Sequence, residues 1–195
     1  MNNYPKYGKP FEPGELYHIY NSAVGKEKLF STDDNYKFFL DRFYFYTREI
    51  LSTYSFCLLG NHFHFLIKFH SSTDHNMASD QLRKFFISYA KSFNKQEFRK
   101  GSLFNKHLKR VKIETNQQLI WTVYYIHRNP VHHKITTSYK KYRWSSYRIL
   151  CSDKPTKLNR KKILDLFSGI EGFVEFHNRN IKEDILNKKI HFLES

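Results

Sequence analysis

Cysteine, proline and glycine are scarce in this chain, which holds 2 Cys, 5 Pro and 7 Gly in 195 residues. Cys57 and Cys151 build no disulfide framework, and no Cys-x-x-Cys pair points to zinc. No run of about eighteen apolar residues is present to span a membrane, and the opening segment lacks the apolar core of a secretion signal. We therefore expect a cytoplasmic protein with reduced thiols and no membrane partner.

Acidic residues are also few, with 18 Asp and Glu against 33 Lys and Arg, which gives a formal net charge of +15. A field of this sign attracts polyanions, so nucleic acid is the expected partner and an anionic membrane surface is the weaker alternative. Aromatic residues are abundant at 18% of the chain. Such rings can pack a core or stack on nucleobases.

The order of elements along the chain predicts one α+β domain with flanking segments. Strands are expected at 15–22, 53–60, 61–69 and 103–113, and helices at 33–51, 77–97 and from 115 to near Pro130. Gly60-Asn61 suits a turn between the middle strands, and Thr32 or Asp33 can cap the first helix. This order favours an antiparallel sheet with split β-α-β topology and helices packed on it.

Composition places the borders of that domain. Residues 1–14 carry proline and glycine turns and are expected to form an irregular arm. The composition changes after Lys154-Pro155, so we place a boundary near 150. The chain then divides into the arm 1–14, a main domain 15–150 and a helical C-terminal extension 151–195.

The pair His62 and His64 is the sharpest local feature. Alternate residues on a strand share a face, so both imidazoles project from one open face while Phe63, Phe65 and Ile67 project into the core. Two adjacent imidazoles make half of a divalent metal site. The other interpretation is a pair of surface histidines on a half-buried strand.

A second feature is Tyr125 with Asn129, which lie one helical turn apart and so share a face. An amide oxygen is a hard neutral ligand suited to Mg²⁺ or Mn²⁺. A metal with neutral ligands keeps the charge that stabilises a phosphodiester transition state. A phenol with a pKa of about 10 needs such help to act as a nucleophile. Both residues can also be packing residues, and Tyr124 is an alternative nucleophile.

Several stretches together resemble a known family, the REP-associated tyrosine transposases and their insertion-sequence relatives. They are FCLLGNHFHFLIK, GSLFNKHLKR, YYIHRNP and YRWSSY, in that order, preceded by YHIYNSAVGKEKLF. The resemblance covers about residues 15–148.

That family is a branch of the HUH nucleases, and the resemblance implies a ferredoxin- or RRM-like sheet. It further implies metal-dependent cutting and rejoining of single-stranded DNA, near hairpins or repeats, through a 5′-phosphotyrosine. Tyr125 would be the nucleophile, and His62, His64 and Asn129 the ligands of Mg²⁺ or Mn²⁺. Both monomers and homodimers occur among such proteins, and the sequence leaves the choice open.

Basic residues concentrate between positions 83 and 112. The candidates for DNA contact are Lys106, Lys109, Arg110 and Lys112, which precede the Tyr125 helix, together with Arg128. Trp121 and Trp144 can stack on bases, although we favour a core role for Trp121, and for His127 we favour a structural role. Two other hypotheses remain open: a catalytically silent nucleic-acid-binding protein on the same fold, and a hydrolase that forms no covalent intermediate.

Overall fold

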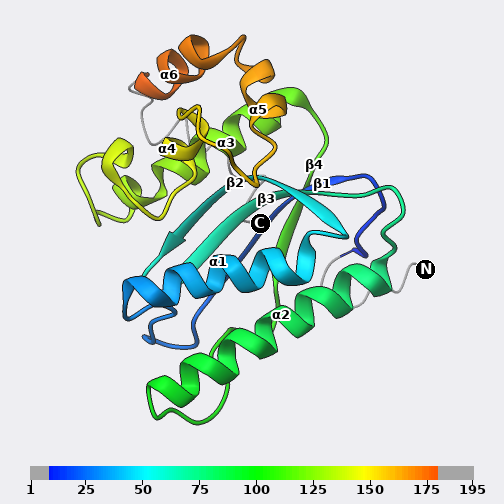
Figure 1. Ribbon diagram of the computed structural model, residues 1–195, viewed down its shortest axis with the longest axis vertical. Coiled ribbons are helices and arrows are strands. Elements are labelled where there is room, and N and C mark those ends of the chain that lie inside the picture. Colours follow the sequence, from blue (N-terminus) through cyan, green and yellow to red (C-terminus); the bar gives the residue numbers. More distant parts are fainter. Residues whose placement is uncertain (1–8, 180–195) are drawn as a thin grey trace.

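The computed structural model describes residues 9–179, which form an α+β fold (Figure 1). The strands are β1 (Leu16–Ser22), β2 (Leu51–Leu59), β3 (His62–Phe69) and β4 (Lys109–Ile113). The helices are α1 (Asp33–Thr47), α2 (His75–Gln96), α3 (Asn116–His132), the short α4 (Tyr147–Leu150), α5 (Arg160–Leu166) and α6 (Ile170–Asn178), with a 3-10 turn η1 at Tyr139–Lys141. No helix in residues 9–179 combines the length and the apolar character needed to cross a bilayer.

The four strands form one sheet in the order β2-β3-β1-β4, with every neighbouring pair antiparallel. β1, α1 and β2 form the first β-α-β unit, and in the sheet β3 lies between its two strands. β3, α2 and β4 form the second unit, and in the sheet β1 lies between its two strands. The predicted split β-α-β topology is therefore confirmed, and it makes β1 and β3 the central strands. The hairpin between β2 and β3 turns at Gly60-Asn61, as the dipeptide predicts.

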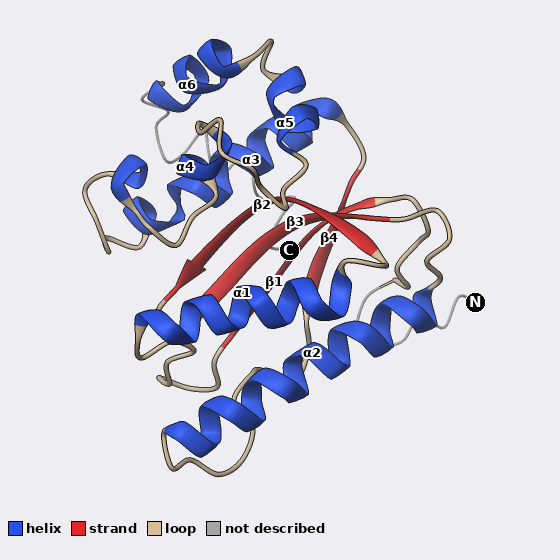
Figure 2. Cartoon of the chain, viewed as in Figure 1, coloured by secondary structure: helices blue, strands red, loops and turns tan. Residues whose placement is uncertain are grey.

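Helices cover both faces of the sheet, so the molecule has three layers (Figure 2). α1 and α2 cover one face of the sheet, and the aromatic core on this side includes Phe39, Phe63, Phe65 and Phe85. α3 and the C-terminal helices cover the other face, and the second core on that side includes Leu66 and Val123. A central strand is thus buried on both sides, and its alternating residues enter two different cores.

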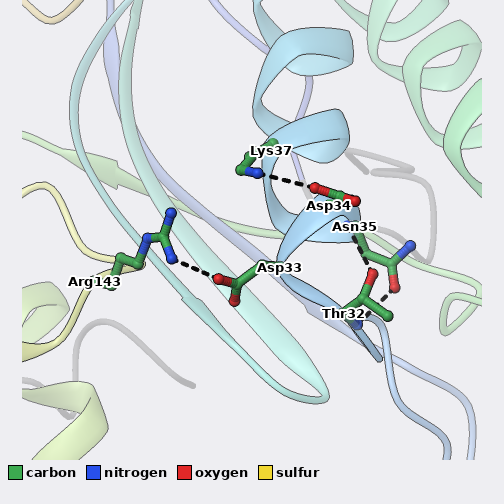
Figure 3. Close-up of polar contacts among 6 residues, drawn as sticks. All are labelled: Thr32, Asp33, Asp34, Asn35, Lys37 and Arg143. Atoms are coloured by element: carbon green, nitrogen blue, oxygen red, sulfur yellow. Dashed lines mark hydrogen bonds and ion pairs between the residues drawn. The ribbon is translucent and has the colours of Figure 1, made fainter.

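The start of α1 is fixed by a reciprocal cap (Figure 3). The Thr32 side chain accepts from the Asn35 backbone N–H, and the Asn35 side chain accepts from the Thr32 backbone N–H. An ion pair between Asp33 and Arg143 then ties this end of α1 to the segment after α3. Thr32, one of the two expected caps, is the residue that begins the helix.

Three predicted boundaries are wrong. The first helix ends at Thr47 rather than 51, because Ile50 and Leu51 turn into the sheet and are buried. The strand expected at 103–113 begins only at Lys109, since residues 101–108 form a loop held to the end of β1 by an isolated bridge. α3 continues past Pro130 to His132, because Pro130 is buried in the last turn and tertiary packing outweighs its local preference.

The flanking segments are described in part. Residues 9–14 contain no helix or strand, in keeping with an irregular arm, and Phe11 anchors them against Phe69 at a ring-centroid distance of 4.8 Å. α5 and α6 fall in the expected helical extension and contribute Ile163 and Phe173 to the same core as α3. The rest of the arm, 1–8, and of the extension, 180–195, lies outside the described residues.

Replacing Phe39 by alanine should destabilise the domain by about 3–5 kcal/mol, because its fully buried ring packs against Phe63, Phe85 and Tyr89. Urea unfolding followed by circular dichroism measures the change. The matched control is Phe45→Ala on the same helix, where the ring is 55% exposed; it should cost less than about 0.5 kcal/mol. Equal losses in the two variants would contradict this description of the core.

Candidate active site

β3 directs His62 and His64 to the face of the sheet that α3 covers. Phe63, Phe65 and Ile67 enter the opposite core, as alternation predicts. The expectation that both histidines lie on an open face is wrong for His64, which is only 3% exposed. α3 crosses this part of the sheet and buries it, whereas His62, near the hairpin turn, stays partly accessible.

α3 places the ring of Tyr125 beside these histidines. The Tyr125 ring centroid is 5.6 Å from that of His64 and 6.0 Å from that of His18, and both contacts are edge-to-face. Asn129, one turn further along α3, is fully buried and donates from Nδ2 to the Tyr125 carbonyl at 3.0 Å. This bond holds the amide plane, so the structure brings the predicted tyrosine, histidines and asparagine together.

Four side-chain atoms in and beside this cluster are buried and have no hydrogen-bond partner among the described residues: His62 Nε2, His64 Nε2, Asn129 Oδ1 and His18 Nδ1. The other ring nitrogen of His62 lies 2.7 Å from Asn61 Oδ1. An amide oxygen can only accept, so His62 Nδ1 carries the proton and His62 Nε2 keeps a free lone pair. Buried polar atoms without partners are rare in folded proteins, and a cation would satisfy His62 Nε2, Asn129 Oδ1 and, where it carries no proton, His64 Nε2.

The environment keeps the histidines neutral, which is the form that binds metals. Burial, reinforced by the neighbouring His133, lowers the pKa of His62 to about 4, while the Asn129 side chain, which could accept a hydrogen bond from the protonated ring, opposes this shift. Burial lowers the pKa of His64 well below its ordinary value, and the neighbouring His18, His62 and His133 lower it further. Burial alone lowers the pKa of His18 to about 3.

The donor set limits which ion can bind. Within residues 9–179, no three His, Cys, Asp or Glu side chains are placed to hold a metal together. A metal here would therefore need the Asn129 amide beside the two imidazoles. A neutral amide oxygen is a suitable ligand for Mg²⁺ or Mn²⁺, whereas imidazoles also bind Zn²⁺, so the choice of Mg²⁺ or Mn²⁺ stays a prediction.

A cleft of about 560 Å³ opens over the cluster. His62, His64, Tyr125 and His133 line it together with Lys106 and Lys109 and with residues at the end of β1. Lys109 Nζ also lies 5.5 Å from the Tyr20 ring centroid. Two of the five predicted DNA-contacting cations thus lie in the wall of the cleft.

The structure does not bring the other three cations to this cleft. Arg110 and Lys112 project to the α1–α2 side of the sheet, because they are paired with Ile19 and Tyr17 of β1. Arg110 packs over the Phe11 ring, and Lys112 forms ion pairs with Glu12 and Glu15. Arg128 lies over the rings of Tyr124 and Tyr139. A DNA-binding role for these three residues stays a prediction.

Tyr124 and His127 belong to the packing on the far side of α3. Tyr124 is fully buried, and its hydroxyl donates to the Arg179 carbonyl at 3.0 Å. His127 is also fully buried, with Nδ1 2.9 Å from His177 Nε2 and Nε2 2.8 Å from Ser146 Oγ. The structural role that we favoured for His127 is confirmed.

The two tryptophans also take part in packing. Trp121 is partly buried and packs edge-on against Tyr124 and Phe176 at the border of the second core, in keeping with the packing role that we favoured. Trp144 stacks on Tyr36 with a ring-centroid distance of 4.5 Å.

Sequence reasoning missed three neighbours of the cluster: His18, Asn61 and His133. His18 Nε2 lies 2.9 Å from His64 Nδ1, and the His133 ring lies 4.5 Å from that of His62. His18 alternates onto the face of the sheet that carries His64, but only the sheet order reveals that β1 lies beside β3. Asn61 was assigned to the turn alone, and His133 lies beyond the point where α3 was expected to end.

The fold and cluster together define a split β-α-β sheet carrying a paired-histidine and tyrosine site. No family model and no curated protein matches the sequence. Among solved structures, the chain is similar to a REP-associated tyrosine transposase bound to a REP hairpin, with a TM-score of 0.62 and 14% identity. The match covers 76% of this chain and 84% of that chain. At this identity the likeness shows the shared fold.

Acid should destabilise the metal-free protein. Burial lowers the pKa of five histidines, which are His18, His62, His64, His127 and His177. Their imidazoles protonate near pH 6.5 in the unfolded chain, so between about pH 4 and 6.5 the unfolded state binds more protons. The free energy of unfolding should fall by more than about 3 kcal/mol from pH 7 to 5 in EDTA, and stay flat from pH 7 to 8. Equal stability at pH 5 and 7 in urea titrations would show that these imidazoles are not buried in the neutral form.

Proposed function

We propose that this chain is a transposase-type, metal-dependent single-strand DNA endonuclease and strand-transferase, with Tyr125 as its nucleophile. The observation that carries the proposal is that His62 Nε2, His64 Nε2 and Asn129 Oδ1 have no hydrogen-bond partner among the described residues and belong to neighbouring side chains beside the Tyr125 ring. With neither a cation nor a bridging water, a purely structural cluster would leave these three polar atoms unsatisfied, at a cost of about 1–3 kcal/mol each.

His62, His64 and Asn129 would hold Mg²⁺ or Mn²⁺. When bound, such an ion would supply positive charge that stabilises the transition state at a phosphodiester. The chain's own groups prepare this site: Asn61 fixes the tautomer of His62, and the bond from Asn129 Nδ2 to the Tyr125 carbonyl leaves the amide oxygen available as a ligand. All three ligands are neutral, so the protein would not cancel the charge of the ion.

Tyr125 would attack the phosphorus of the scissile phosphodiester. A bond forms between the phenolic oxygen and phosphorus while the bond from phosphorus to the 3′ oxygen breaks. The phenol loses its proton and the departing 3′ oxygen gains one, so the products are a 5′-phosphotyrosine and a free 3′-hydroxyl. The link conserves the phosphodiester bond energy, and attack by another 3′-hydroxyl reverses the step and joins a new strand.

Single-stranded DNA, including strands beside a hairpin, is the proposed substrate class. Lys106 and Lys109 line the cleft that holds Tyr125, where they can contact phosphates. The net charge of +15 adds long-range attraction. The transposase whose solved structure is similar to this chain is bound to a REP hairpin, which supports the same class of ligand for this chain.

Tyr125→Phe should abolish a covalent protein–DNA adduct while leaving DNA binding within about twofold, because only the hydroxyl is removed. The assay uses end-labelled hairpin oligonucleotides with randomised single-stranded flanks and Mn²⁺. Adducts are resolved on a denaturing protein gel, and binding is read by fluorescence anisotropy.

The matched control is Tyr124→Phe, which removes the neighbouring hydroxyl that donates to the Arg179 carbonyl. This variant should still form the adduct. An adduct that survives Tyr125→Phe but disappears in Tyr124→Phe would overturn the assignment of the nucleophile. Binding without any wild-type adduct would favour a catalytically silent DNA-binding protein, and cleavage without an adduct would favour a hydrolase.

A further inference from the structure

A second hollow adjoins the proposed catalytic cleft. It has a volume of about 510 Å³ and lies between α2 and the loop 101–108, on the α1–α2 side of the sheet. Asn21, Asn105 and Lys106 line both hollows, so the two adjoin near the beginning of β4. A strand that leaves the catalytic cleft on this side would meet the second hollow next.

The lining of this hollow has the two properties that an unpaired nucleotide needs. Its floor is apolar and aromatic, with Leu82, Phe86, Phe104 and Leu108 among the lining residues. Its cations are Arg83, Lys106 and Arg110, and no Asp or Glu belongs to the described lining. Bases stack on aromatic rings while phosphates contact cations, and this combination is typical of sites for single strands.

Two cations of the rim are placed to serve such a ligand. The Arg110 Cζ atom lies 4.3 Å from the Phe11 ring centroid, and this contact holds the guanidinium at the wall of the hollow. Arg83 is exposed and pairs with Asp80, which also pairs with Lys84. Exposed ion pairs of this kind are weak, so a phosphate can compete for Arg83 while Lys84 remains with Asp80.

We propose that this hollow, the α2 pocket, binds a nucleotide of single-stranded DNA that continues from the catalytic cleft. The proposal rests on the proposed function and extends it, since it assigns a base-binding site outside the cluster around Tyr125. It also gives Arg110, which faces away from the catalytic cleft, a place on the path of the DNA.

Photocrosslinking tests the α2 pocket in the Tyr125→Phe protein, which cannot form the adduct. The probe is a single-stranded 20-mer in which 5-iododeoxyuridine replaces thymidine, and mass spectrometry locates the crosslinks. We expect crosslinks at Phe86 or Phe104, reduced at least about tenfold by Ala90→Phe, which fills the pocket. Met77→Phe adds a ring to an exposed position on the same helix and should leave them unchanged.

A charge comparison keeps the test decisive if Ala90→Phe folds poorly. Arg83→Gln should weaken binding of the same 20-mer at least about threefold more than Lys95→Gln, which removes an equal charge from α2 away from the pocket. Bound DNA with no crosslink in the pocket, or equal effects of the two charge variants, would overturn the proposal. Adduct formation by the unmodified protein is measured separately. Failure of the α2 pocket proposal can therefore be distinguished from failure of the proposed function.

The contact between His18 and His64 carries an independent inference. His18 is fully buried on β1, and its Nε2 lies 2.9 Å from His64 Nδ1. One proton lies between these nitrogens, and its position decides the chemistry of His64. If His64 donates it, His64 Nε2 keeps the lone pair that a metal needs; if His18 donates it, His64 Nε2 carries a proton instead.

We infer that His18 is a positioning residue, which accepts from His64 Nδ1–H and so presents His64 Nε2 to the metal. It would do for His64 what Asn61 does for His62. Partners of this kind around a metal site raise metal affinity by about 10–100-fold. This inference rests on the proposed metal site but not on cleavage.

Long-range ¹H–¹⁵N NMR of the EDTA-treated protein reads the tautomer directly. We expect His64 to be protonated on Nδ1 and not on Nε2, and the reverse result would overturn the inference. In Mn²⁺ titrations followed by electron paramagnetic resonance, His18→Leu should bind at least about tenfold more weakly. His18→Gln, whose amide oxygen can accept the same hydrogen bond, should stay within about threefold of the unmodified protein. Equal losses in both variants would contradict the positioning role.

Discussion

The burial of β3 on both faces is the constraint on which the rest of the structure depends. One face of the strand contributes Phe63, Phe65, Ile67 and Phe69 to the aromatic core beneath α1 and α2. A shift of register by one residue would move those rings into the other layer, so the core fixes which face carries His62 and His64. The cost of misplacing several buried aromatic rings is far larger than any energy in the histidine cluster itself.

The position of α3 over the sheet is the second feature on which the proposed site depends. His127 connects α3 to α6 through His177 and to the segment before α4 through Ser146, and all of these contacts are buried. Tyr124 adds a hydrogen bond to the Arg179 carbonyl from the same side of α3. The far side of α3 is therefore anchored by the C-terminal helices, while its near side presents Tyr125 and Asn129 to the histidines. The C-terminal extension is part of what positions the proposed nucleophile.

Strict sequence patterns predicted the parts of the fold and site that local rules control. Alternation placed His62 and His64 on one face, helical spacing placed Tyr125 beside Asn129, and Gly60-Asn61 marked the hairpin. Features that depend on non-local packing were missed. His18 becomes a neighbour of His64 only through the β1–β3 pairing, and the face of Arg110 and Lys112 depends on the register of β4 against β1. Pro130 remains inside α3 because its surroundings bury it, which no local preference could reveal.

Anomalous diffraction from crystals soaked in Mn²⁺ tests the central claim most directly, because it locates the ion without reference to activity. The account predicts one ordered manganese peak within coordination distance of His62 Nε2, His64 Nε2 and Asn129 Oδ1, with the Tyr125 hydroxyl facing the same cleft. A manganese peak at another position would contradict it. So would the absence of a peak beside these three atoms at saturating Mn²⁺.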